Sequence, residues 1–483
     1  MRNRPNVLLI LSDDHGYGDR SRSSRDPAVR TPNLDRLAES GVTCPEAYVT
    51  APICSPSRSA IISGRHQRRW GSRWFDTSRF PDHLPSLAER FGELDYATGY
   101  FGKVHYGPEQ VGDRACPPHH GFRTTYYGLA GQQQGRLNYL RHSRSAVEEY
   151  GPEAGWRMAA QPMLEGDDPV ELERFLTDEL AERAGGFIAG SSDQPFFCML
   201  AFNAVHNFCW QLPAEELQRR GLPVHADWRD QDGSYAEWYD GVISPNLDHG
   251  RDYYLAQLEL MDAAIGRLLD QLQSSGLAEN TIIVYLTDNG GSTCNYGDNG
   301  PLAGTKYTLW EGGIRVPFIV RWPAGGWSGG VDRAGVVSSL DLFPTLLTAA
   351  GAEPQVTGAS DGIDLGPLLA GTSTGGHDQL CWDCGFQWAI RDGDLKLRMV
   401  DGESAGALGI RRTEHAEPGT GVMLVDLAND PGETHDLAEE LPGEVARLTD
   451  AFQDWLASVT SDASTSASPC GRPSAPATRP SPG

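Results

Sequence analysis

A thiol that could act as a nucleophile lies in residues 54–58 (CSPSR), two positions before a proline and four before an arginine. The segment follows Ala51, Pro52 and Ile53, which are apolar and turn-like. A cysteine in such surroundings is ordinarily a small buried hydrophobe. A catalytic role for Cys54 would require other groups in the chain that activate it and stabilise developing charge.

Two pairs of oxygen-bearing side chains follow predicted strands. Asp13 and Asp14 come after the apolar run at residues 6–11, and Asp288 and Asn289 come after a β-rich run in the same way. Such residues are often only turn formers. Together, however, they offer four oxygen ligands of the kind that a hard divalent cation such as calcium prefers.

Cations and imidazoles occur in three further places. Lys103 and His105 occupy alternate positions after an apolar pair, so both would face one side of an extended segment. His206 follows a predicted strand and is a candidate general acid, and Lys306 is a second candidate contact for an anion. Each residue alone is more typical of a structural or solvated position, so the functional hypothesis depends on their joint presence.

Strands that alternate with helices must position these groups. Apolar runs predict buried strands at residues 6–11, 196–202 and 281–286. Thr31 is predicted to cap a helix that starts at Pro32 and stops at Gly41. A longer helix is predicted over residues 253–275, where apolar residues recur every three or four positions. This order predicts an α/β fold, with a large, mainly parallel, doubly wound sheet flanked by helices.

The pattern changes after about residue 350. Short strand candidates at residues 387–390 and 395–400 alternate with turns, and a helix is predicted over residues 442–457. The tail is rich in Ser, Thr, Ala and Pro and is predicted to be disordered. The expected regions are a catalytic α/β domain at 1–350, a smaller α+β subdomain with antiparallel strands at 351–457, and the tail at 458–483.

The composition limits the class of protein. The 483 residues are 39% hydrophobic, which is enough for a large core. A formal net charge of −25 argues against nucleic acid or an anionic membrane as a partner. No apolar run reaches the roughly 20 residues of a membrane span. No export signal is visible, so the cytoplasm is the expected compartment, with a misassigned start codon as the alternative.

The nine cysteines do not form an evident disulfide framework. Cys381 and Cys384 have the spacing of a redox or metal motif, but no second such pair and no histidine pair completes a zinc site. We predict that both are strand or turn residues, with a local disulfide as the alternative.

These segments stand in the order found in the sulfatase family, which the sequence resembles from about residue 6 to residue 457. The stretch around Cys54 matches the core of the family signature. Val104 and Tyr106 stand where many members carry Trp and Leu, and we expect them to tune the pocket. The similar stretches are residues 6–18, 54–58, 99–105, 287–291, 306–317 and 426–438.

The resemblance implies hydrolysis of a sulfate ester. A formylglycine-generating enzyme would oxidise Cys54 to formylglycine, whose hydrate would be the nucleophile. One calcium ion would be held by Asp13, Asp14, Asp288 and Asn289 together with the modified Cys54.

The same resemblance implies roles for the other candidates. Lys103 and Lys306 would neutralise sulfate oxygens, and Arg58 would steady the nucleophile. His206 would protonate the departing alkoxide. His105 would then take a proton from the sulfated intermediate, which expels sulfate and restores the aldehyde.

Two alternatives remain at this stage. A phosphonate monoester or phosphodiester hydrolase of the same superfamily could use the same groups. A noncatalytic calcium- and anion-binding protein is disfavoured, because burying so many polar groups without use is costly. The expected substrate is a small-molecule or carbohydrate sulfate ester, and the negative charge mildly favours a singly sulfated one. Aromatic residues near the motifs that could stack on its ring are Trp70, Trp74, Phe75, Trp210 and Trp310.

Overall fold

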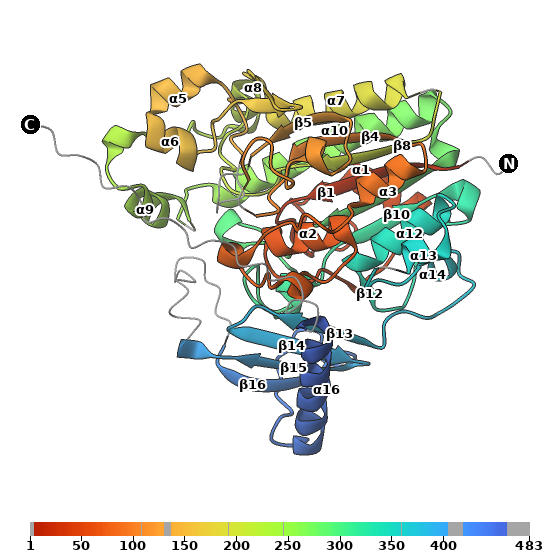
Figure 1. Cartoon of the computed structure of the whole chain (residues 1–483). Helices are drawn as coiled ribbons and strands as arrows, with labels where there is room; N and C mark the ends of the chain where they lie inside the picture. Colours follow the sequence, from red (N-terminus) through yellow and green to blue (C-terminus); the bar gives the residue numbers. More distant parts are fainter. Residues whose placement is uncertain are drawn as a thin grey trace, which may run out of the picture.

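A ten-stranded sheet forms the centre of the computed structural model (Figure 1). The structure describes residues 4–107, 109–129, 137–191, 193–244, 246–358, 360–403 and 419–460. Five parallel strands form the middle of the sheet, in the spatial order β9 (Thr281–Thr287), β1 (Asn6–Ser12), β8 (Phe196–Ala201), β4 (Ala97–Lys103) and β5 (Thr124–Gly128). The predicted mainly parallel sheet is therefore confirmed.

Short strands extend both edges, and most are antiparallel to their neighbours. Beside β9 lie β10 (Phe318–Arg321), β2 (Val42–Thr43) and β11 (Val331–Asp332). Beside β5 lie β6 (Met163–Glu165) and β7 (Asp168–Val170). A separate parallel pair consists of β3 (Ala47–Tyr48) and β12 (Val337–Ser338).

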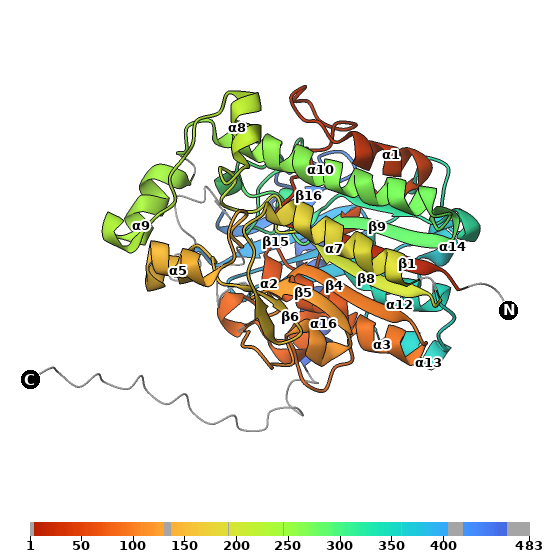
Figure 2. The same ribbon diagram turned by 90° about the horizontal axis from the view of Figure 1, so that it is seen from above.

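Helices cover both faces of the sheet, as Figure 2 shows from above. Side chains alternate between the faces of a strand, so Leu8 and Ile10 of β1 pack in one core and Leu9 packs in the other. The first core includes residues of α1 (Pro32–Ser40), α7 (Leu176–Gly190) and α10 (Gly250–Ser274). The second includes residues of α2 (Cys54–Ser63), α3 (Leu87–Glu93) and α12 (Leu342–Ala349).

Shorter helices complete the described part of the chain. They are α5 (Arg144–Tyr150), α6 (Pro152–Arg157), α8 (Ala214–Arg220), α9 (Tyr235–Trp238), α11 (Glu311–Ile314), α13 (Pro354–Thr357) and α14 (Gly366–Leu369). Among the described residues, no helix combines the length and apolar character that crossing a membrane requires.

The start of α1 differs from the sequence prediction. Thr31 precedes the helix, but its side chain makes no capping hydrogen bond. The carboxylate of Asp262, on α10, instead accepts from the amides of Asn33 and Leu34 at 3.0 and 2.8 Å. A residue distant in the sequence therefore accepts the hydrogen bonds of the first amides of the helix, and the local sequence could not identify it.

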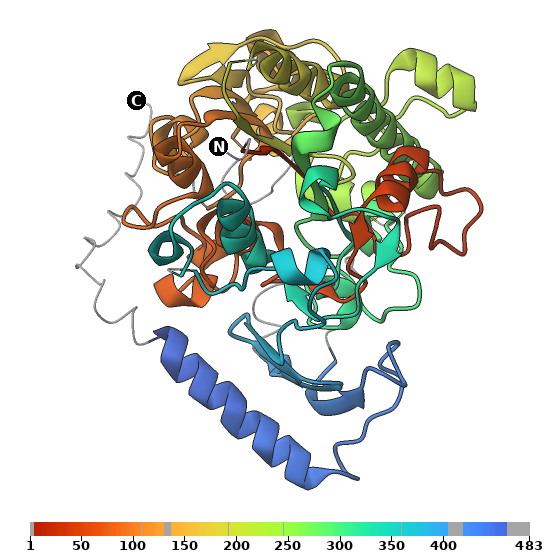
Figure 3. The same ribbon diagram turned by 90° about the vertical axis from the view of Figure 1, so that its right-hand side faces the viewer.

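A smaller antiparallel sheet follows the main body and is called the C-terminal sheet below (Figure 3). Its strands are β13 (Gln379–Asp383), β14 (Gln387–Asp392), β15 (Leu395–Val400) and β16 (Gly421–Asp426). Helix α16 (Pro442–Thr460) packs on it, and Phe452 stacks on Trp388 with ring centroids 4.2 Å apart. The helix continues three residues beyond the predicted end at Ala457. The rest of the predicted tail, residues 461–483, lies outside the described residues.

Cys381 and Cys384 belong to two different packing clusters. Cys381 packs beside α16, whereas Cys384 packs toward the main body near Trp74. Both are free thiols in the described part of the chain, so the alternative of a local disulfide is wrong. Their roles are packing roles, as the strand-or-turn prediction expected.

Candidate active site

The candidate side chains meet where the parallel strands end. Ser12 of β1 pairs with Thr287 of β9, so Asp13 and Asp14 emerge beside Asp288. The other neighbour of β1 is β8, which leads to the His206 segment, and β4 next to it ends at Lys103. Carboxyl ends of parallel strands share one edge of a sheet, where open α/β folds bind their ligands.

Cys54 is the first residue of α2, and the whole helix is buried. Its Sγ lies 3.6 Å from Asp13 Oδ1. The free amides at a helix start carry partial positive charge and favour an anion beside them. Burial nevertheless raises the pKa of the Cys54 thiol far above its ordinary value, against the lowering effect of Lys103 and Lys306. A thiolate at this position is therefore disfavoured.

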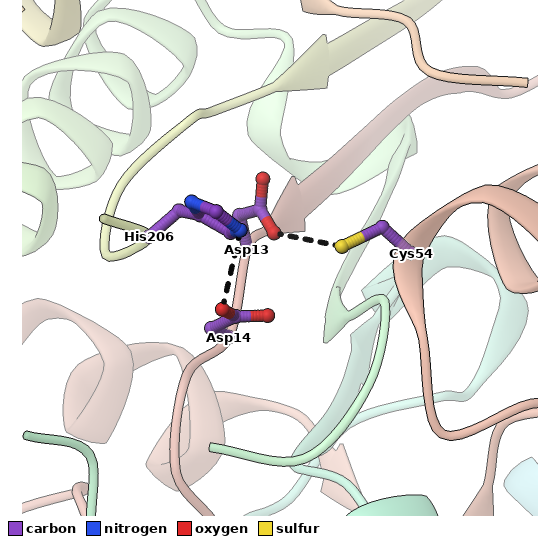
Figure 4. A group of neighbouring side chains, drawn as sticks. All are labelled: Asp13, Asp14, Cys54 and His206. Atoms are coloured by element: carbon purple, nitrogen blue, oxygen red, sulfur yellow. Dashed lines mark hydrogen bonds and ion pairs between the residues drawn. The ribbon is translucent and has the colours of Figure 1, made fainter. Parts of the chain in front are cut away.

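Four possible ligand groups cluster tightly, as Figure 4 shows. One ligand atom from each of Asp13, Asp14, Cys54 and His206 lies within 4.8 Å of all the others. Asn289 adjoins this cluster through its Nδ2, which donates to Asp14 Oδ1 at 2.6 Å. The Asn289 Oδ1 is buried and has no hydrogen-bond partner among the described residues. An unpaired amide oxygen beside carboxylates fits the donor set of calcium.

Asp288 joins the same centre by two contacts. Its Oδ1 accepts from the Asp14 backbone amide at 3.4 Å, and its Oδ2 accepts from Arg58 Nε at 2.6 Å. Burial disfavours the charged carboxylate, but Arg58, Lys103 and Lys306 together hold the pKa of Asp288 below its ordinary value. The charged carboxylate form of Asp288 is therefore favoured.

Three buried cations face the carboxylates. Arg58 also lies 3.4 Å from Asp13, and Lys103 forms an ion pair with the same carboxylate. Lys306 Nζ lies 2.7 Å from Asp14 Oδ1. Burial and the nearby Asp288 charge raise the pKa of Asp13 to about 7, although Lys103 and Arg58 oppose the shift. The centre thus brings together all the charged residues that the sequence analysis selected.

His105 reaches the centre by a route that the sequence analysis did not predict. Its φ of 57° places it in the left-handed region, so the predicted extended geometry after Lys103 is wrong. The ring stacks on Phe75 with centroids 5.9 Å apart. Burial lowers the pKa of His105 well below its usual value, and the Lys103, Arg58 and Lys306 charges lower it further. The imidazole is therefore neutral.

His206 lies between Lys306 and Asp14. Its Nε2 is 3.0 Å from Lys306 Nζ and 3.5 Å from Asp14 Oδ2. Burial alone would lower the pKa of Lys306, but Asp14 and its other neighbours, Cys54, Tyr307 and Asp13, together raise it well above its ordinary value, so this lysine is a cation and a donor. His206 Nε2 is then the acceptor of that contact.

The sequence analysis missed Asn295. Its Nδ2 donates to Asp14 Oδ2 at 2.5 Å, and the side chain is buried. Asn295 thus binds one carboxylate oxygen of Asp14, a candidate metal ligand. Its position six residues after Asn289 is the only sequence signal, and a short helical turn at Thr293–Asn295 creates the contact.

Residues 5–352 match the sulfatase family, which covers most of the chain. The protein belongs to the sulfatase family. It is a sulfuric ester hydrolase, as its homologues support. The predicted family and enzyme class are therefore confirmed.

Two sequence relatives extend over nearly the whole chain. Arylsulfatase A from Homo sapiens is 30% identical, over 93% of this chain and 86% of that protein. Steryl-sulfatase from Rattus norvegicus is 28% identical, over 92% of this chain and 88% of that protein. The similarity therefore includes the region of the C-terminal sheet.

A solved structure is also similar over nearly the whole chain. The crystal structure of Ps i-CgsB in complex with k-i-k-neocarrahexaose has a TM-score of 0.74 and 25% sequence identity. The superposition covers 94% of this sulfatase and 93% of that chain. The main sheet and the C-terminal sheet thus recur together in a relative.

Proposed function

We propose that this sulfatase hydrolyses its sulfate ester with Cys54 oxidised to formylglycine and with one calcium ion in the site. The products are an alcohol or phenol and inorganic sulfate. The observation that carries the proposal is the convergence of Cys54 with three buried cations and three buried carboxylates at one sheet edge. Charges are costly to bury even when paired, and sulfate ester chemistry gives each of them a use.

The environment of Cys54 argues against the unmodified thiol as the nucleophile. A buried thiol with a strongly raised pKa holds little thiolate, the form that attacks an ester. A formylglycine hydrate would supply a hydroxyl group at the same position. The start of α2 favours negative charge there, which suits an attacking oxygen and a sulfate.

The carboxylates and amide support a calcium ion held by Asp13, Asp14, Asp288, Asn289 and the oxidised Cys54. When bound, calcium would polarise a sulfate oxygen and offset its negative charge. In the protein alone, these carboxylates pair with Arg58, Lys103 and Lys306. A calcium ion would supply positive charge to the same carboxylates. Lys103 and Lys306 could then contact an anion instead.

Lys103 and Lys306 are the proposed contacts for the sulfate oxygens. Both side chains are almost fully buried, and each approaches the centre from a different segment. Cations placed in advance in a site without bulk water stabilise developing negative charge strongly. Arg58, which bridges Asp13 and Asp288, fixes the arrangement of the two carboxylates.

The two histidines differ in their proposed proton roles. His105 is neutral and accepts a proton from the hydroxyl group of the intermediate. Lys306 Nζ donates to His206 Nε2 at 3.0 Å and stays the cation, and His206 is the proposed donor of a proton to the leaving oxygen. The proposal thus assigns the two imidazoles the roles of a base and an acid.

For the alcohol part, we propose a small-molecule or carbohydrate sulfate ester. The complex of Ps i-CgsB with k-i-k-neocarrahexaose supports a carbohydrate. Phe75 is half-buried beside His105, so its ring offers a face to a sugar or aryl group.

Relative activity on different anions tests the proposal. The protein is produced with a formylglycine-generating enzyme and assayed with calcium on 4-nitrophenyl sulfate, bis(4-nitrophenyl) phosphate and a 4-nitrophenyl phosphonate monoester. The common leaving group isolates the preference for the anion. We expect the highest kcat/KM on the sulfate, and a higher value on either phosphorus ester would replace this function with the alternative hydrolase.

A further inference from the structure

The loop that carries Lys306 is attached at its backbone to both halves of the centre. The amide of Lys306 donates to the Gly291 carbonyl at 3.1 Å, next to the Asp288 segment. The amide of Tyr307 donates to the Pro52 carbonyl at 2.8 Å, just before Cys54. The loop therefore joins the proposed metal ligands to the nucleophile segment.

A third attachment comes from the C-terminal sheet. Gln387, the first residue of β14, donates from Nε2 to the Tyr307 carbonyl at 2.7 Å. Its Oε1 accepts from the Leu309 amide at 3.1 Å. The side chain is completely buried, so both ends of the amide are used on this loop. Gln387 thereby links the backbone of Tyr307 to that of Leu309, immediately after Lys306.

The loop needs such support because its backbone is strained. Tyr307 has a φ of 76°, which is unfavourable for a residue with a side chain. Strained residues persist only where the surrounding structure holds them. The hydrogen bond from Gln387 reaches the carbonyl of this very residue, and Lys306 is its direct neighbour.

The C-terminal sheet also contacts the nucleophile segment. Trp382 on β13 donates from Nε1 to the Val49 carbonyl at 2.7 Å, five residues before Cys54. Asp383 forms an ion pair with Arg68, which lies beyond the end of α2, at 2.7 Å. The sheet thus holds both segments that carry groups to the sulfate position.

We propose that Gln387 is a positioning residue of the active site, which acts through the Lys306 loop and keeps Lys306 Nζ against Asp14 and His206. The inference rests on the proposed function of Lys306. It gives the C-terminal sheet a part in the reaction, although none of its residues belongs to the candidate catalytic set.

A pair of matched variants tests the inference. Gln387→Met keeps the length of the side chain and removes both hydrogen bonds. Gln271→Met is the control, because Gln271 donates to the Gly185 carbonyl at 2.8 Å near the end of α10, at the edge of the sheet opposite the active site. We expect kcat/KM to fall by about tenfold to a hundredfold for Gln387→Met and by less than about twofold for the control. Equal losses in the two variants would overturn the inference.

A double-mutant cycle separates positioning from general support. In a Lys306→Ala background, Gln387→Met should change kcat/KM by less than about twofold, because residues that act through one another are not additive. The same fold-loss in both backgrounds would overturn the inference. If Gln387→Met does not fold, Gln387→Glu, which keeps an acceptor for Leu309, takes its place in the cycle.

A measurement without turnover distinguishes this inference from the proposed function. Amide hydrogen exchange of residues 306–310 should become faster in Gln387→Met than in the control. Unchanged exchange would overturn the inference even in an active enzyme. Absence of sulfate ester hydrolysis in the wild-type protein would instead contradict the proposed function, and the exchange result would still report on Gln387.

Discussion

Two buried clusters of charge in this sulfatase look alike at first but differ in how completely they are paired. One is the active centre around Asp13, Asp14 and Asp288. The other, called the Glu311 cluster here, joins α11 to the C-terminal sheet. In it, Glu311 contacts Lys396 at 2.9 Å and Tyr48 at 2.6 Å, and Lys396 also contacts Glu433 at 3.0 Å. Both clusters are inaccessible to solvent.

The Glu311 cluster has a partner for every carboxylate oxygen. Glu433 completes it, because its second oxygen accepts from the Glu311 amide at 2.6 Å. The active centre keeps unused capacity: among the described residues, Asn289 Oδ1 and His105 Nδ1 have no hydrogen-bond partner. Buried charge therefore does not mark a functional site by itself, and the two clusters differ in whether polar atoms beside the charges are left for a ligand.

The largest expected effect is on activity in the active centre. Cys54→Ala removes the proposed nucleophile, so we expect kcat to fall at least about 10⁴-fold. The melting temperature should stay within a few degrees, because only one small side-chain group is removed, at the first residue of a helix. Kinetics on 4-nitrophenyl sulfate and a thermal melt check this. Substantial remaining activity would show that the two clusters do not differ in function as argued.

The matching change in the Glu311 cluster should affect stability. Lys396→Met leaves Glu311 and Glu433 buried without their shared cation, which should cost about 3–5 kcal/mol of unfolding free energy. Activity per folded molecule should fall less than about tenfold. Urea unfolding and active-site titration separate the two quantities. A loss of activity with unchanged stability would reverse the assignment of this cluster.

Lys306→Ala should lower activity more than it lowers stability, the reverse of Lys396→Met. Losing this proposed sulfate contact should lower kcat/KM by about 10²–10³-fold. Its effect on stability should be smaller than that of Lys396→Met, because Asp14 keeps hydrogen bonds from Asn289 and Asn295. Unfolding and kinetic measurements on both variants provide the comparison, and a similar profile for the two would contradict it.

Acid should weaken the fold through residues outside both clusters. Burial lowers the pKa of His66 and of His120 to about 4. The unfolded chain binds these protons near pH 6.5, so this stability is present above pH 6.5 and is lost as pH falls to about 4. Each histidine should contribute about 3 kcal/mol. Urea unfolding between pH 7 and 4.5 checks this, and His66→Gln with His120→Gln should flatten the profile. If the double variant loses unfolding free energy with falling pH as steeply as the wild type, groups other than His66 and His120 cause the loss.

The main fold was predictable because its signals are local. The runs that became β1, β8 and β9 are short, apolar and followed by turns, and their spacing around helices predicts parallel pairing. The cap of α1 was not predictable, because Asp262 lies more than two hundred residues away. The left-handed backbone of His105 was missed for the same reason, since packing against Phe75 and the surrounding cations outweighs the local extended preference.

Most residues of the candidate site could be predicted from the sequence, but the contacts between them could not. Motif residues such as Lys306 could be selected from the sequence, yet nothing in the sequence pairs Lys306 with His206. Asn295 and Gln387 were missed, because neither lies in a motif and the contact of each is created by tertiary folding. Residues with chemistry of their own can thus be selected from the sequence, whereas residues that contact them only in the folded chain cannot.

The state of Cys54 tests the central claim most directly. Trypsin releases residues 37–58 as one peptide, which also contains Cys44 as an internal control. The protein is taken from its own host or from cells with a formylglycine-generating enzyme, and the peptide is measured by mass spectrometry. We predict an aldehyde at Cys54 and an intact thiol at Cys44. A thiol at Cys54 despite an active modifying enzyme would contradict the proposed nucleophile.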